Sequence, residues 1–120
     1  MEKFFIEHDF NIFKPVLENG KIDLILEKNN RLLRIQIKTI MNDGTKIIPL
    51  RKISHNIGKY KIKRYTKEDI DFFIGVDIEA GDLYILPVEF SSKYRNCISI
   101  KKCQEFKNNF KQLELLCGNM

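Results

Sequence analysis

Three residues with complementary chemistry lie close together in this sequence: Asp23, Gln36 and Lys38. A carboxylate and a carbonyl-type oxygen can bind a hard divalent cation, and an ammonium group can hold a water molecule or stabilise a phosphoryl transition state. Such a set could hydrolyse a phosphodiester if the fold gathers it in one place. The alternative interpretation is a solvated sheet face that carries an ordinary surface charge pair.

The segment from Lys21 to Lys38 is predicted to be a β-hairpin that gathers these residues. Apolar residues alternate at a period of two on both sides of Asn29-Asn30, and Asn tolerates the positive φ of a tight turn. If the two asparagines form the loop, cross-strand partners have numbers that sum to 59. Asp23 then lies opposite Gln36, with Lys38 on the same face. The other face is predicted to be wholly apolar, with the pairs Ile22 and Ile37, Leu24 and Ile35, and Leu26 and Leu33.

This segment resembles the PD-(D/E)xK motif of the restriction-endonuclease-like nucleases, in the variant with glutamine in place of the second acid. The motif reads Pro15, Asp23 and Gln36-Ile37-Lys38, with Thr39 following. Sequences of that group similarly carry a short strand ahead of the proline, as in FNIFKP. They also carry an acid-aromatic strand and a tyrosine-proline strand, as in DIDFFIGVD and DLYILPV. The resemblance covers roughly residues 10 to 90 and is strongest to intron homing endonucleases and archaeal Holliday-junction-resolvase-like nucleases.

The resemblance implies an endonuclease that depends on Mg²⁺, with Mn²⁺ as a possible substitute, and that acts on double-stranded or branched DNA. Asp23, Gln36 and the Ile37 carbonyl would bind the metal, while Lys38 would orient the attacking water or offset charge on the phosphorane. Relatives carry an additional acid on a longer first helix, and Glu2 is its expected substitute. The resemblance also implies a homo-oligomer, because two strands must be cut. Since Asp23 and Lys38 cancel in charge, the alternative is a catalytically inactive DNA-binding or assembly module.

The net charge of +5 arises from one segment of the chain. Residues 44–67 contain eight lysines and arginines and no acid, whereas the rest of the chain has thirteen bases and sixteen acids. Because aromatic residues and a histidine lie among these bases, the segment is predicted to contact DNA phosphates and to stack on sugars or bases. A solvated loop is the alternative. The predicted DNA contacts are Arg51, Lys52, Lys59, Tyr60, Lys61, Lys63, Arg64 and Lys67.

Length and composition predict one domain, residues 1–120, of a soluble protein in the cytoplasm, or in the nucleus of a eukaryotic or viral host. No run of eighteen apolar residues is present, and the first residues lack the features of a signal peptide, so no membrane association is expected. Cys97, Cys103 and Cys117 have no C-x-x-C spacing, which indicates neither a disulfide framework nor a zinc site. Cys103 and Cys117 are expected to pack as small apolar residues.

The hydrophobic pattern predicts an α/β (α+β) fold with a mixed central sheet flanked by helices, and the resemblance implies that this is a restriction-endonuclease-like core. The strand at Phe72–Val76 is almost entirely apolar, so it is expected to be buried on both faces. Asp69 and Asp71 precede it, and a structural role is favoured for both over a place in the site. The other predicted elements are a helix at Glu2–His8, strands at Phe10–Lys14, Lys46–Leu50 and Leu83–Val88, and an amphipathic helix at residues 101–117.

Overall fold

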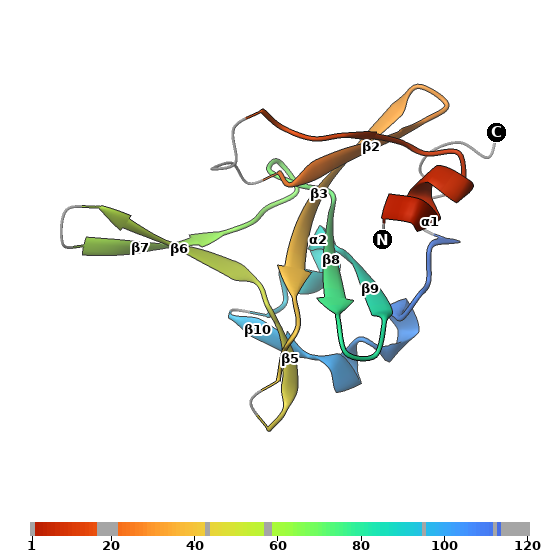
Figure 1. The fold of residues 1–120 in the computed structure, drawn as a ribbon. Coiled ribbons are helices and arrows are strands. Elements are labelled where there is room, and N and C mark those ends of the chain that lie inside the picture. Colours follow the sequence, from red (N-terminus) through yellow and green to blue (C-terminus); the bar gives the residue numbers. More distant parts are fainter. Residues whose placement is uncertain are drawn as a thin grey trace.

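The computed structural model describes residues 2–16, 22–42, 44–56, 59–94, 96–111 and 113, and for residues 4, 51–56 and 59–64 it describes the backbone alone. The main sheet of this described part has the strand order β1-β2-β3-β8-β9 (Figure 1). β3 and β8 are parallel and the other neighbours are antiparallel, so the sheet is mixed, as predicted. Its strands are β1 (Asn11–Phe13), β2 (Leu24–Lys28), β3 (Arg31–Thr39), β8 (Phe72–Asp77) and β9 (Asp82–Pro87).

The hairpin of β2 and β3 has the predicted register. Leu24 pairs with Ile35 and Leu26 with Leu33. Asn29 and Asn30 form the turn with φ values of 54° and 65°. The predicted pairing of Ile22 with Ile37 is wrong, because the β2–β3 ladder begins at Leu24 and the Ile37 N–H is bound by the Asp23 side chain. Ile22 packs instead with the core on the opposite face of the sheet.

Apolar side chains form a core on each face of the main sheet, since alternate residues of a strand point to opposite sides. On the first face, Phe5 of α1 (Glu2–Glu7) packs edge-to-face against Phe10 and Phe110, with ring centroids 5.7 and 6.1 Å apart. The position of α1 confirms the predicted short N-terminal helix. The other buried members of the first core are Leu24, Leu26, Leu33, Ile35, Phe72, Ile74, Ile85 and Leu113.

The second face is covered by a smaller sheet and short helical turns. β5 (Lys46–Pro49) lies between β4 (Met41–Asn42) and β10 (Cys97–Ser99), and α2 (Val88–Ser91) follows β9. Two 3₁₀ turns, Ile100–Lys102 and Gln104–Phe106, complete the layer. The layer approaches the main sheet closely at Gly75 of β8, where a Cβ would lie 2.8 Å from the Ile48 Cδ1 atom. β8 is therefore buried on both faces, as predicted.

A two-stranded arm leaves the body between the two sheets. β6 (Arg51–Asn56) and β7 (Lys59–Arg64) form an antiparallel hairpin that extends away from the main sheet (Figure 1). The arm contains most of the basic segment, for which the sequence predicted a contact surface but no hairpin. Only its backbone is described, so the predicted contacts of the seven arm side chains lie outside the described part: Arg51, Lys52, Lys59, Tyr60, Lys61, Lys63 and Arg64.

The predicted C-terminal helix at residues 101–117 is wrong for residues 101–110. Lys107 forms a β-bridge with Tyr84, and the Asn108 N–H donates to the Leu83 carbonyl at 2.6 Å. Asn108 itself has a φ of 52°, which a helix does not permit. The chain thus crosses the edge of the main sheet and delivers Cys103 to one core and Leu113 to the other. Residue 112 and residues 114–120, including Cys117, lie outside the described residues.

Burial in the second core raises the pKa of the Cys103 thiol to about 11, in agreement with the predicted packing role of this residue. Within the described ranges, no helix has the length and apolar character needed to cross a membrane.

Candidate active site

β3 is the middle strand of the main sheet, and it presents Gln36 and Lys38 on the face of the second core. The backbone hydrogen bonds of β3 show toward which neighbouring strand each residue directs its N–H and C=O groups. Arg34 accepts from the Asp71 N–H beside β8, whereas Ile35 accepts from the Asp23 N–H on the β2 side, at 2.9 and 2.8 Å. The N–H and C=O groups of Ile37 therefore point toward β2 and Asp23.

Asp23 is fixed directly onto the backbone of β3. Its Oδ2 atom accepts a hydrogen bond from the Ile37 N–H at 2.7 Å, in the place where a continued β2 strand would pair. This bond positions the carboxylate beside the residue that separates Gln36 from Lys38. The structure thus joins Asp23 to the Gln36-Ile37-Lys38 segment of β3, and the link is a side-chain to backbone bond.

Gln36 is buried with an unsatisfied oxygen. Only 8% of the residue is exposed, and its Oε1 atom has no hydrogen-bond partner within the described residues. A buried amide oxygen without a partner costs about 1–3 kcal/mol, so proteins rarely keep one without a use. Gln36 is the register partner of Phe73 on β8, which places its side chain against the second core.

Tyr65 is a site residue that sequence reasoning placed only among the possible stacking aromatics. The Lys38 Nζ atom lies 5.2 Å from the centroid of the Tyr65 ring, a cation–π contact. The same ring packs edge-to-face on Phe73, with centroids 5.3 Å apart. Its hydroxyl is also buried without a hydrogen-bond partner in the described part, as is the Gln36 Oε1 atom, and Gln36 and Tyr65 are both neighbours of Phe73. The signal in the sequence was the place of Tyr65 at the end of the basic segment.

Comparison with known proteins agrees with this fold. The sequence profile described as PD-(D/E)XK endonuclease matches residues 3–114, nearly the whole chain. The chain belongs to the PD-(D/E)XK endonuclease family. A solved structure of a bacterial homing endonuclease, I-Ssp6803I, has a similar fold, with a TM-score of 0.72 and 21% sequence identity over 82% of this chain and 68% of that one. No curated protein sequence matches the chain.

Members of the PD-(D/E)XK family generally use divalent metals, and the oxygen donors at this site fit such an ion. The Asp23 carboxylate, the unpartnered Gln36 Oε1 and the Ile37 carbonyl supply oxygen, the ligand type that Mg²⁺ prefers. Among the described residues, no group of three or more His, Cys, Asp or Glu side chains is placed to hold a metal. Glu2, the predicted additional acid, forms an ion pair with Lys14, which lowers the pKa of the Glu2 carboxyl.

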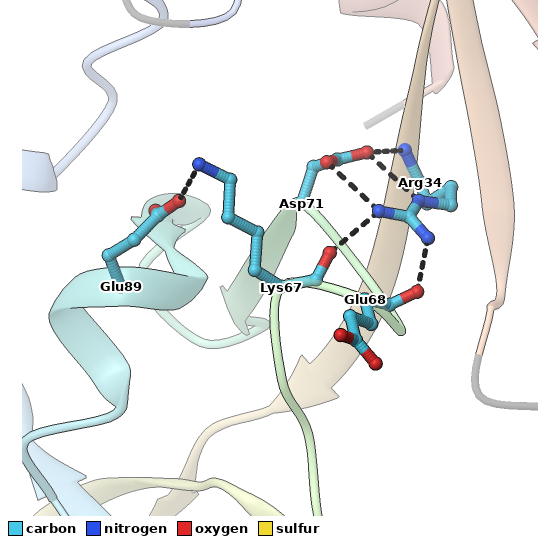
Figure 2. Close-up of polar contacts among 5 residues, drawn as sticks. All are labelled: Arg34, Lys67, Glu68, Asp71 and Glu89. Atoms are coloured by element: carbon cyan, nitrogen blue, oxygen red, sulfur yellow. Dashed lines mark hydrogen bonds and ion pairs between the residues drawn. The ribbon is translucent and has the colours of Figure 1, made fainter.

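The turn that precedes β8 is held by a separate polar network (Figure 2). The Asp71 carboxylate accepts bonds from the Arg34 N–H and Nε atoms at 2.8 and 3.2 Å, and Asp69 accepts from the Thr66 N–H at 3.0 Å. Both acids therefore have the structural role that the sequence favoured. Lys67, a predicted DNA contact, forms an ion pair with Glu89 at 3.2 Å.

Proposed function

We propose that this PD-(D/E)XK family member is a divalent-metal-dependent DNA endonuclease that hydrolyses phosphodiester bonds. Its proposed catalytic residues are Asp23, Gln36 and Lys38. The observation that carries the proposal is the buried, unpartnered Oε1 of Gln36, next in sequence to the residue whose N–H fixes the Asp23 carboxylate. An oxygen left without a partner in the free protein is ready to bind a cation without breaking an existing hydrogen bond. A site of purely structural residues would satisfy that atom.

Each residue has a distinct role in this proposal. Asp23, Gln36 and the Ile37 carbonyl bind Mg²⁺, which would activate water and neutralise phosphate charge. The bond from the Ile37 N–H fixes the orientation of the Asp23 carboxylate before any ligand arrives. Lys38 stabilises the charge that develops on the phosphate oxygens, and its cation–π contact with Tyr65 limits the positions of its ammonium group.

The arm supplies the electrostatic attraction to DNA in this proposal. Its register makes Arg51 the Cα partner of Arg64 and Lys52 the partner of Lys63. Bases at paired positions on both strands give the arm a high density of positive charge, which attracts a polyanion. The arm leaves the body at Leu50 and returns at Tyr65, so DNA bound along it approaches the site.

The similar homing endonuclease fold supports a role of that type, with the resolvase type as the second possibility. Cutting both strands of a duplex requires two sites, so the proposal includes a homo-oligomer. A duplex and a four-way junction of equal length separate the two types: a homing endonuclease cuts the duplex at a defined sequence, whereas a resolvase prefers the junction.

The test is cleavage of supercoiled, linear and branched DNA in Mg²⁺ or Mn²⁺, with chelator as a blank. Asp23→Asn and Lys38→Ala are each expected to reduce the single-turnover rate by on the order of 10²–10³-fold, the usual cost of losing one charged group that stabilises the transition state. Two exposed residues of the same types provide matched controls, Asp9→Asn and Lys3→Ala. Asp9 has a φ of 65°, which Asn tolerates.

Cleavage that persists in Lys38→Ala would refute the catalytic assignment. Absence of cleavage by the parent, together with salt-sensitive DNA binding, would favour the inactive DNA-binding module. Among the described residues, no three His, Cys, Asp or Glu side chains are grouped to hold a metal, so Gln36→Glu provides a gain-of-function test. An added negative charge raises affinity for a divalent cation, so this variant should reach half-maximal cleavage at a lower Mg²⁺ concentration than the parent.

A further inference from the structure

Tyr65 contacts the proposed site at Lys38, although it lies outside the Asp23, Gln36 and Lys38 motif. Its ring holds the Lys38 ammonium and packs on Phe73, the strand neighbour of Gln36. Only 6% of the residue is exposed. A tyrosine that merely filled space in this position would either turn its hydroxyl to solvent or pair it, because buried hydroxyl groups are nearly always hydrogen-bonded.

The Tyr65 hydroxyl is instead buried and without a partner in the described part, as is the Gln36 Oε1 atom. Burial raises the pKa of Tyr65, and the nearby charges of Asp23 and Asp69 raise it further. The hydroxyl therefore keeps its proton at neutral pH and is available as a hydrogen-bond donor. A donor whose own ring contacts an ammonium group is suited to an anionic oxygen.

We propose that Tyr65 is a positioning and substrate-binding residue of this site, whose ring holds Lys38 and whose hydroxyl donates a hydrogen bond to a phosphate oxygen of bound DNA. This inference rests on the proposed function. Tyr65 immediately follows β7, so the residue that touches Lys38 is also the first residue after the arm.

Two substitutions separate the role of the Tyr65 ring from that of its hydroxyl. Tyr65→Phe keeps the ring, and with it the contacts to Lys38 and Phe73, but removes the hydroxyl. Tyr65→Leu removes the ring as well. Tyr94→Phe is the matched control, because Tyr94 lines the same cavity of about 190 Å³ as Tyr65 and its ring contacts a different lysine, Lys102, at 5.5 Å.

The hydroxyl is tested by a stability measurement combined with a rate measurement. Removing a buried donor that has no partner in the free protein should leave the melting temperature of Tyr65→Phe equal to or above that of the parent. The same variant should cleave DNA about 10- to 100-fold more slowly, the usual cost of losing a hydrogen bond to a charged group. If the hydroxyl has only a structural role, Tyr65→Phe should have a lower melting temperature and an unchanged cleavage rate. That result would overturn the proposal.

The ring is tested by a double-mutant comparison with Lys38→Ala. Tyr65→Leu should slow cleavage beyond Tyr65→Phe in the parent, whereas in the Lys38→Ala background the two Tyr65 variants should cleave equally, because the ring acts through that lysine. Independent effects would overturn the positioning role. If Tyr65→Leu does not fold, the comparison of Tyr65→Phe with Tyr94→Phe decides the proposal.

Failure of the proposed function gives a different result from failure of this inference. If the parent does not cut DNA, the readout becomes the affinity for a duplex oligonucleotide in Ca²⁺, measured by fluorescence anisotropy. Weaker binding by Tyr65→Phe than by Tyr94→Phe then supports the phosphate contact. Equal binding by these two variants rejects the phosphate contact. Cleavage by Tyr65→Phe at the same rate as the parent also rejects it.

Discussion

Arg34 holds the turn between the arm and β8, and its removal should destabilise the fold measurably. Its guanidinium donates to the Lys67 carbonyl at 2.8 Å and to the Glu68 carbonyl at 2.5 Å, while its Nε and Nη2 atoms bond Asp71 at 3.2 and 3.3 Å (Figure 2). Arg34→Met keeps most of the aliphatic stem and deletes all of these donors. The side chains of Arg34 and Asp71 are 33% and 25% exposed, so the pair is partly shielded from solvent.

The magnitude follows from this geometry. Hydrogen bonds to charged groups contribute about 1.5–3 kcal/mol in sheltered positions, whereas exposed ion pairs contribute about 0–1 kcal/mol. The two backbone carbonyls belong to exposed residues and can bind water after the substitution. We therefore expect Arg34→Met to lower the free energy of unfolding by about 2 kcal/mol, which for a chain of this size lowers the Tm by roughly 8 °C.

The assay is urea and thermal unfolding of the parent, Arg34→Met, Asp71→Asn and the double variant. The coupling energy between the two positions should be at least about 1 kcal/mol, since each residue is the main partner of the other. Arg31→Met is the control, because Arg31 lies on the same strand and is exposed. A loss below about 0.5 kcal/mol for Arg34→Met, or additive effects of the two substitutions, would refute the reasoning.

Three further predictions concern other parts of the fold. Hydrogen bonds from Lys46 and a backbone N–H lower the pKa of Asp77, so its stabilising effect is present above the ordinary carboxyl pKa and is lost as the pH falls through the lower folded value. The Tm of the parent should therefore drop more than that of Asp77→Asn between about pH 5 and pH 3, the range in which carboxyl groups usually titrate. Parallel plots of Tm against pH for the two proteins would contradict this. Gly75→Ala should cost about 1–3 kcal/mol in chemical unfolding, because its Cβ would lie 2.8 Å from Ile48 Cδ1, and an unchanged midpoint would show that Ile48 moves aside freely. In salt titrations of DNA binding, Lys61→Ala should reduce the log–log slope by about 0.9 if this arm residue neutralises one phosphate, and an unchanged slope would remove it from the contact surface.

The hairpin of β2 and β3 could be predicted from the sequence because its information is local. Alternating apolar residues and an Asn-Asn turn determine the register, and the structure has the predicted pairs from Leu24 to Leu33. The same rule failed at Ile22, one residue beyond Asp23. There the Asp23 side chain binds the β3 backbone where a paired strand would otherwise bind, and the hydrophobic periodicity contains no information about that bond.

Errors elsewhere arose where tertiary contacts override a local pattern. Cys103, Phe106, Phe110 and Leu113 have helical spacing, yet the chain between them bends across the sheet edge and supplies both cores. The basic segment gave the charge of the arm without its hairpin, although Lys-Tyr-Lys-Ile-Lys at residues 59–63 alternates at the period of two that is typical of a strand. Tyr65 joined the site through packing on β8, which no spacing in the sequence reveals.

The central claim is that Asp23 and Gln36 share one divalent cation beside Lys38, and anomalous diffraction from crystals grown with DNA and Mn²⁺ tests it most directly. The account predicts a manganese peak about 2.1 Å from both a carboxylate oxygen of Asp23 and the Oε1 atom of Gln36, the distance typical of a small divalent cation. A peak bound by other residues, with Gln36 Oε1 hydrogen-bonded to a protein donor, would contradict it.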